Sequence, residues 1–240
     1  MGGLSVVQAL WVEGPLTAME QLSARSFLAQ GHDYHLYSYG EVPGLPAGAR
    51  RLPAEEILPA SAIFRYRSAD GRGSYAGFAN LFRYKLLHER GGWWADTDMI
   101  CLRPLDFDDE WVFASERLRE GGTLSTNGLV KAPAGNALCG DCFERGSRAE
   151  DRDRRWGAIG PRFFHEAIGR HGLTRFVRPP ELFCPVDWWR SEELLAPGEP
   201  PAEAYTVHLW NEMWRFNGWA KESCHPPEAF YQRLHRRYPA

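Results

Sequence analysis

The chain has 240 residues, of which 44% are hydrophobic and 25% are charged, a composition typical of a globular protein with a single core. Its net charge of −3 gives no electrostatic basis for nucleic-acid binding, and no apolar run approaches the roughly 18 residues of a transmembrane helix. The first residues lack the basic region of a signal peptide, and five cysteines without disulfide spacing favour a reducing, cytoplasmic location.

Strand and helix patterns alternate at the start of the chain. Apolar periodicity predicts a strand over 5–12, a helix over 16–30 and a second strand over 32–39. This order suits a parallel sheet with a right-handed crossover. Residues 41–73 are rich in proline, glycine and arginine, so we expect loop there apart from one short helix over 54–58.

Residues 74–105 are the most informative stretch. Apolar side chains recur every three or four residues over 74–90, which predicts a helix, and two glycines end it. A buried strand is expected over 93–102. It contains Asp96 and Asp98, whose carboxylates would share one face of an extended chain. Such a pair repels itself unless a cation lies between, and a hard divalent metal is the usual solution.

Two other acidic pairs have the same spacing but a different context. The pair in 106–108 follows a proline in a loop, and the pair in 151–153 lies in a charge-alternating surface segment. Both are expected to be solvated. Only Asp96 and Asp98 follow a helix, a double glycine and an apolar strand, so the metal is expected there.

The second half of the chain continues the mixed pattern. It predicts strands and helices over 111–115, 128–131, 136–150, 161–171, 176–178, 183–188 and 227–238, with an extended segment over 204–214. Cys139 and Cys142 form a C-x-x-C pair without a partner pair, so a redox or zinc role is not favoured. The last helix carries a basic face that is expected to be solvated, although peripheral contact with an anionic membrane is an open alternative.

The stretch 74–105 resembles the D-x-D region of nucleotide-sugar glycosyltransferases. The residues that carry the resemblance are Arg83-Tyr84, Leu87, Gly91-Gly92, the aromatic residue at 94 and Asp96-x-Asp98. The resemblance is to the "glycosyltransferase sugar-binding region containing D-x-D motif" family, related to glucosylating toxins and alpha-1,4-glycosyltransferases. It implies a single GT-A domain, an α/β fold whose Rossmann-like mixed sheet is flanked by helices. Residues 1–135 would form the nucleotide-binding half, and 136–240 the acceptor side and the C-terminal closing segment.

The resemblance also implies which residues act at the donor diphosphate. Asp98 and Asp96 would hold Mn²⁺ or Mg²⁺, and Arg83 would add a fixed positive charge beside them. His208 lies in the late extended segment, and it is expected to return to the metal or the diphosphate. A lone histidine is more commonly structural, so this role depends on the resemblance.

Four further residues are expected to contact the donor. Trp11 would stack on the base, Asn80 and Asn127 would reach the sugar or ribose, and Trp210 would belong to a closing lid. Trp11 fits a core tryptophan equally well, and Asn127 before a glycine also fits a simple turn. The family commonly has an acidic residue at position 80, so Asn80 leaves the donor sugar open. The Trp188-Trp189 pair is a candidate acceptor platform.

The residues and the family resemblance together predict a metal-dependent glycosyltransferase, a hexosyltransferase of carbohydrate biosynthesis. It would move a sugar from a nucleotide donor, UDP-sugar favoured, to a glycan or other hydroxyl acceptor, with retention implied by the resemblance alone. The alternatives are a GDP-mannose-dependent mannosyltransferase, a D-x-D phosphatase of haloacid-dehalogenase type and a non-catalytic nucleotide-sugar or glycan binder. The phosphatase would need a downstream lysine, for which Lys131 is the candidate, and a later acidic pair that the sequence lacks.

Overall fold

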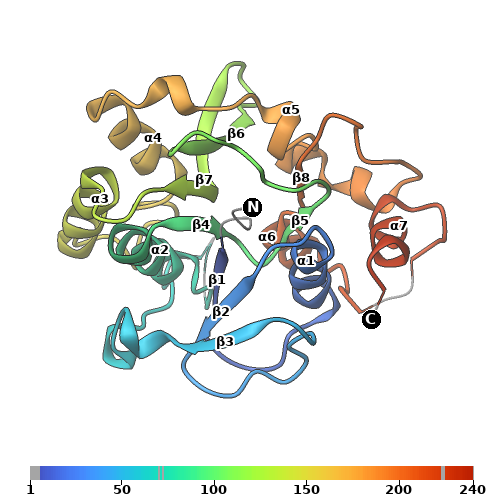
Figure 1. Ribbon diagram of the computed structural model, residues 1–240, viewed down its shortest axis with the longest axis horizontal. Coiled ribbons are helices and arrows are strands. Elements are labelled where there is room, and N and C mark those ends of the chain that lie inside the picture. Colours follow the sequence, from blue (N-terminus) through green and yellow to red (C-terminus); the bar gives the residue numbers. More distant parts are fainter. Residues whose placement is uncertain (1–5, 70, 72, 223–224, 240) are drawn as a thin grey trace.

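A computed structural model describes residues 6–69, 71, 73–222 and 225–239. Its main sheet has six strands in the order β3-β2-β1-β4-β7-β6 (Figure 1). Strand β1 pairs in parallel with β2 and β4, β2 pairs in parallel with β3, and β7 is antiparallel to both β4 and β6. The strands are β1 (Val7–Trp11), β2 (Tyr34–Ser38), β3 (Arg50–Pro53), β4 (Gly92–Ala95), β6 (Val112–Arg117) and β7 (Thr123–Ala132).

Helices cover both faces of this sheet (Figure 1). On one face lie α2 (Ala76–Arg90), α3 (Ala137–Arg148) and α4 (Pro161–Arg170). On the other lie α1 (Ala18–Ala29), α7 (Phe230–Arg237) and a small sheet of β5 (Met99–Cys101) and β8 (Thr206–His208). Because successive side chains on a strand alternate, Trp93 enters one core and Trp94 the other. The expected α/β fold with a mixed sheet flanked by helices is confirmed.

The early elements agree with the expected pattern, with one omission. The strand expected over 5–12 is β1, although Ser5 lies outside the described residues. Segment 41–73 was expected to hold one short helix but contains strand β3 and two 3-10 turns, η1 (Ala54–Glu56) and η2 (Ala60–Ala62). Strand β3 pairs only with β2 at the sheet edge, where a terminal proline is tolerated.

The prediction of late strands over 176–178 and 183–188 is wrong. The segment forms a 3-10 turn η3 (Thr174–Phe176), a short helix α5 (Pro180–Phe183) and a 3-10 stretch η4 (Trp188–Leu195). Prolines at 179, 180 and 185 lack the N–H that a strand ladder requires, so one isolated bridge between Val177 and Phe113 is formed instead. After β8 the chain forms α6 (Asn211–Asn217). No helix within the described residues is long and apolar enough to span a bilayer.

The strand expected over 93–102 is in fact two strands in two different sheets. After β4 the chain turns, and the Met99 N–H donates to the Asp96 carbonyl across 3.0 Å. Strand β5 then leaves the main sheet to pair with β8. The extended-chain argument for Asp96 and Asp98 was therefore wrong, because both residues lie at a turn that follows the carboxyl end of β4.

A glycine ends the helix that comes before β4 and that turn. Gly91 ends α2 with φ of 64°, and an added Cβ would lie 2.4 Å from the Ala134 nitrogen, so no larger residue fits. On the neighbouring strand, the reversal of the β6–β7 hairpin falls at 118–122. Asn127 is consequently inside β7 and not in a turn, which overturns the simple-turn interpretation of this residue.

Candidate metal and donor site

A cavity of about 590 Å³ opens beside the carboxyl ends of β1 and β4, where α/β sheets place their ligands. Its lining includes residues of β1, α2, the turn after β4, β6, β7, β8 and the segment after β8. Residues within 156–161 and Trp188 also contribute. All eight residues expected at the site line it: Trp11, Asn80, Arg83, Asp96, Asp98, Asn127, His208 and Trp210. The structure thus brings these residues together from distant parts of the sequence, while their roles stay predictions.

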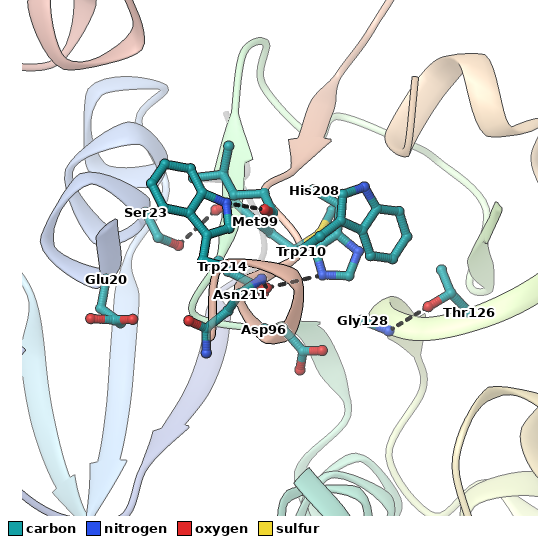
Figure 2. Close-up of polar contacts among 12 residues, drawn as sticks. Glu20, Ser23, Asp96, Met99, Thr126, Gly128, His208, Trp210, Asn211 and Trp214 are labelled. Carbon is teal, nitrogen blue, oxygen red and sulfur yellow. Dashed lines mark hydrogen bonds and ion pairs between the residues drawn. The ribbon is translucent and has the colours of Figure 1, made fainter. Parts of the chain in front are cut away.

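Asp96, Asp98 and His208 form a compact cluster at one end of the cavity. Each offers a ligand atom, and these atoms all lie within 4.8 Å of one another. His208 Nε2 is 3.2 Å from Asp98 Oδ2. The register of β5 against β8 places Met99 opposite His208, and this pairing brings the histidine back to the acidic turn. Figure 2 shows His208 and Asp96 beside the segment of Trp210 and Asn211.

The described residues hold Asp96 through one of its carboxylate oxygens. Its Oδ1 accepts hydrogen bonds from Arg83 Nη2 at 2.5 Å and from Trp94 Nε1 at 2.8 Å. The second oxygen, Oδ2, lies beside Gly128, where an added Cβ would come within 3.2 Å. Because Gly128 has no side chain, space stays open next to Asp96 Oδ2.

Arg83 is a buried support for the acidic turn. Its side chain is 3% exposed, and its two terminal nitrogens donate to Asp96 and to the carbonyl of Asn127. The guanidinium also lies 4.8 Å from the Trp94 ring centroid, a cation–π contact. Because both terminal nitrogens already have protein acceptors, Arg83 orients Asp96 in addition to lining the cavity.

Asp98 is held by the C-terminal segment. Its Oδ2 accepts from His208 Nε2 and from the Asn211 backbone N–H, the latter at 2.8 Å. Between them Trp210 has φ of 57°, and it is the one non-glycine residue of the described chain with positive φ. This strained conformation is typical of functional sites. The Trp210 ring packs on His208 at 3.8 Å between centroids (Figure 2). The Trp210 Nε1 donates to the Val186 carbonyl.

The two carboxylates differ in their acidity. Burial raises the pKa of Asp96, against the opposing effect of Arg83. For Asp98 burial acts in the same direction, but His208 outweighs it and the pKa falls to about 2. Burial alone would lower the pKa of His208, yet the Asp98 carboxylate raises it well above its ordinary value. Without a metal, Asp98 and His208 therefore form an ion pair.

The cluster fits a divalent metal. Two carboxylates and an imidazole are a donor set that suits Mn²⁺, and carboxylates are the ligands that Mg²⁺ prefers. Asp96 Oδ2 makes no hydrogen bond within the described part of the chain, and Gly128 leaves room beside this oxygen. Both observations are consistent with a site that has space for an additional positive ion.

The expected donor contacts lie around the remaining wall. Asn127 Nδ2 donates to Asn80 Oδ1 at 2.9 Å and to the Tyr84 hydroxyl at 3.0 Å, so β7 and α2 hold the two amides together. Trp11 is half-buried and donates its Nε1 to the Gly14 carbonyl. Since Trp11 borders the cavity with part of its surface open, it is not a fully buried core tryptophan.

Four residues that the sequence analysis did not favour as site residues lie outside the cavity. Asp106 is exposed, and Asp151 forms a surface ion pair with Arg155. His32 is buried and accepts from the Leu105 N–H, a structural role. The phosphatase candidate Lys131 donates to the Phe107 carbonyl and does not line the cavity.

Sequence reasoning missed one cavity residue of chemical interest, Glu116. It follows the apolar part of β6, and burial raises its pKa to about 7. In the sequence, the position of this carboxylate at the end of a strand could have marked it as a candidate site residue. However, the expected strand stopped at Ser115, one residue short of it.

Comparison with known proteins identifies a family model that matches part of the chain. Residues 58–118, which include α2 and the acidic turn, match the family described as "Glycosyltransferase sugar-binding region containing DXD motif". The resemblance expected from the sequence is therefore confirmed. A search of curated proteins finds no match.

Several solved structures are similar at low sequence identity. The PaToxG glycosyltransferase is 11% identical over 70% of this chain and 71% of its own, with a TM-score of 0.48. A transferase carrying cysteine-to-serine substitutions is 10% identical over 70% and 86%, with a TM-score of 0.47. The glycosyltransferase GlyE of Streptococcus pneumoniae TIGR4, in its apo form, is 11% identical over 74% and 46%, with a TM-score of 0.38.

Proposed function

We propose that the chain, whose residues 58–118 match the D-x-D glycosyltransferase family, is a metal-dependent enzyme that takes a UDP-sugar as its donor. The observation that carries the proposal is the cluster of Asp96, Asp98 and His208 at one end of a 590 Å³ cavity. That volume lies within the range of small-molecule sites. A hexosyl group would pass to a glycan or other hydroxyl acceptor.

The residues around the cluster preorganise it for a metal. Arg83 and Trp94 fix one oxygen of Asp96, and the Asn211 N–H fixes one oxygen of Asp98. A bound Mn²⁺ or Mg²⁺ would supply positive charge to the donor diphosphate, which otherwise leaves poorly. Preorganised polar groups of this kind need no rearrangement when charge develops on the leaving group.

The donor would extend from the metal end toward β1. Trp11 would stack on the base, and Asn80 with Asn127 would bind hydroxyl groups of the sugar or ribose. Both amides are neutral, so they offer hydrogen bonds without adding charge beside the diphosphate. Uridine is favoured by the family resemblance, and a GDP-sugar is the alternative donor.

The C-terminal segment would close the site. Ser74 before α2 donates to Glu212 of α6 at 3.0 Å, a contact across the cavity. His208 and Trp210 come from the same segment, so residues 136–240 would complete a donor site formed mainly by residues 1–135. We also propose retention of anomeric configuration, on the resemblance alone, and a reducing cytoplasmic location, which the buried free cysteines of the described chain suit.

Hydrolysis of nucleotide sugars without an acceptor tests the proposal. Purified protein with Mn²⁺ should release UDP slowly from one of a panel of UDP-sugars, and EDTA should stop this release. Hydrolysis of p-nitrophenyl phosphate with no action on nucleotide sugars would favour the phosphatase alternative. Binding of UDP without hydrolysis of any nucleotide sugar, and without transfer to any glycan offered, would favour a non-catalytic binder.

A further inference from the structure

A second cavity adjoins the donor cavity. It has a volume of about 520 Å³, and residues 116–124, 155–166 and 188 contribute to its lining. Five residues border both cavities: Glu116, Trp156, Gly157, Pro161 and Trp188. Strand β6 and helix α4, which both contribute to this lining, lie near each other in Figure 1. A ligand in the second cavity would therefore be next to a ligand in the first.

The lining of the second cavity combines aromatic rings with balanced charge. Trp156, Trp188 and Phe163 supply the aromatic surface. Three arginines and three glutamates also line it: Arg119, Arg155, Arg162, Glu116, Glu120 and Glu166. A site for an anionic ligand would be expected to have a net positive charge, and this lining has none. Aromatic faces with many hydrogen-bonding groups and no excess charge fit an uncharged carbohydrate.

Trp188 has the exposure that a stacking platform requires. It is 37% exposed, one of two large hydrophobic residues in the described chain that are so open. The Trp189 ring meets it edge to face at 5.5 Å, which supports the orientation of the indole. Trp188 therefore offers exposed indole surface at the border of both cavities, where the C–H face of a sugar ring could pack on it.

Glu116 is the charged group at the junction. Its carboxylate makes no hydrogen bond or ion pair with another described residue, whereas Glu120 pairs with Arg162 and Asp187 pairs with Arg117. Burial raises the pKa of Glu116 to about 7, which agrees with a carboxylate that lacks a partner. A partly buried carboxylate without a partner is free to accept a hydrogen bond from a ligand hydroxyl.

We propose that the second cavity binds the acceptor as an uncharged oligosaccharide, with one sugar ring on Trp188 and the hydroxyl nearest the donor hydrogen-bonded to Glu116. The proposal rests on the proposed function, because it needs a sugar donor in the adjoining cavity. It assigns the acceptor to a chemical class, a neutral glycan, and not to a phosphorylated molecule or a peptide.

Binding of defined trisaccharides tests this site without turnover. Maltotriose, cellotriose, chitotriose and mannotriose are titrated into indole-¹⁵N-labelled protein with Mn²⁺ and UDP, and the Trp188 signal is assigned with Trp188→Phe. At least one trisaccharide should shift the Trp188 indole signal. Glu116→Gln should weaken that binding about tenfold, the effect of one hydrogen bond to a charged group. Glu144→Gln, on the exposed surface of α3, is the matched control and should change nothing.

The outcomes separate this proposal from the proposed function. If UDP with Mn²⁺ binds but none of the four trisaccharides shifts Trp188, the acceptor site is wrong and the donor site stands. The proposal is also overturned if Glu116→Gln leaves trisaccharide affinity unchanged, or if inorganic phosphate shifts Trp188 more strongly than any sugar. Failure of UDP to bind, with trisaccharides still shifting Trp188, would instead contradict the proposed function and leave the sugar site in place.

Discussion

The residues around the acidic turn give two neighbouring carboxylates different properties. Asp96 is tied to a permanent cation and an indole through one oxygen, whereas Asp98 is tied to His208 and a backbone N–H. The pKa of Asp96 is raised and that of Asp98 is lowered to about 2. Asp98 is consequently ionised at any physiological pH, and it is the residue on which metal binding should depend most.

Gly128 offers a test of the space beside Asp96. In Gly128→Ala the new Cβ would lie 3.2 Å from Asp96 Oδ2 and 3.6 Å from His208 Cε1, so it should crowd the metal position. We expect Mn²⁺ affinity to fall about tenfold or more, with little change in the melting temperature of the metal-free protein. Calorimetric Mn²⁺ titration measures this. Gly40→Ala, where an added Cβ meets nothing, is the control, and equal affinities in both variants would contradict the expectation.

The raised pKa of Glu116 should make the free energy of unfolding of the protein depend on pH. Burial raises this pKa to about 7, with Asp187 acting in the same direction and His208 and Arg162 opposing. A raised folded-state pKa means that the protonated form is favoured by folding. This contribution to the free energy of unfolding is complete below about pH 4.3, the pKa of an unfolded glutamate, and is lost as pH rises through 7.

Glu116→Gln removes that titration. The melting temperature of the variant minus that of wild type should increase between pH 5 and pH 8, and the variant should be the more stable protein at pH 8. Thermal denaturation across this range, with Glu144→Gln beside it, measures the difference. A constant difference at all pH values would show that Glu116 titrates normally.

Among the elements, α6 is the least anchored part of the site. Of its seven residues only Trp214 is buried, yet its first N–H binds Asp98 and its Glu212 bonds to Ser74 across the cavity. Ligands that fill the cavity should therefore stabilise this helix. Hydrogen exchange of residues 211–217 should slow when UDP and Mn²⁺ are added, while exchange of α3 should stay unchanged. Binding without slower exchange in α6 would show that this segment does not close over the donor.

The sequence predicted those helices and strands whose apolar periodicity and end signals lie within the element itself. The period of α2 and its glycine stop are visible in the sequence, as is Asn136, which caps α3 by accepting from the Cys139 N–H. The break between β4 and β5 was not visible, because apolar residues continue on both sides of it. Only the pairing partners, β7 for one strand and β8 for the other, separate them.

The site was predictable only where its residues lie close together in the sequence. Asp96 and Asp98 stand together in the sequence, although they meet at a turn and not on an extended strand. His208 lies 110 residues after Asp98, and its position depends on the register of β5 with β8, which no local pattern reports. Only the family resemblance pointed to it. Glu116 lacked even that signal.

In the whole molecule, the 590 Å³ cavity is built from both halves of the chain. Ligand binding to the native state alone should therefore raise the stability of the whole protein. With Mn²⁺ present, UDP should raise the melting temperature more than GDP, ADP or CMP at equal concentration. Differential scanning fluorimetry measures this. A larger shift with GDP would identify a mannosyltransferase-type donor and contradict the uridine assignment.

Metal-dependent donor binding through Asp98 is tested most directly by calorimetric titration of UDP in the presence of Mn²⁺. Wild-type protein should bind UDP, and EDTA should abolish binding. Asp98→Asn keeps a side-chain oxygen for the Asn211 N–H but removes the charge, and it should lose at least about 100-fold in affinity while the protein stays folded. Asp106→Asn, on an exposed loop, should match wild type. Equal Mn²⁺-dependent binding of UDP by Asp98→Asn and wild type would contradict the assignment of the metal site.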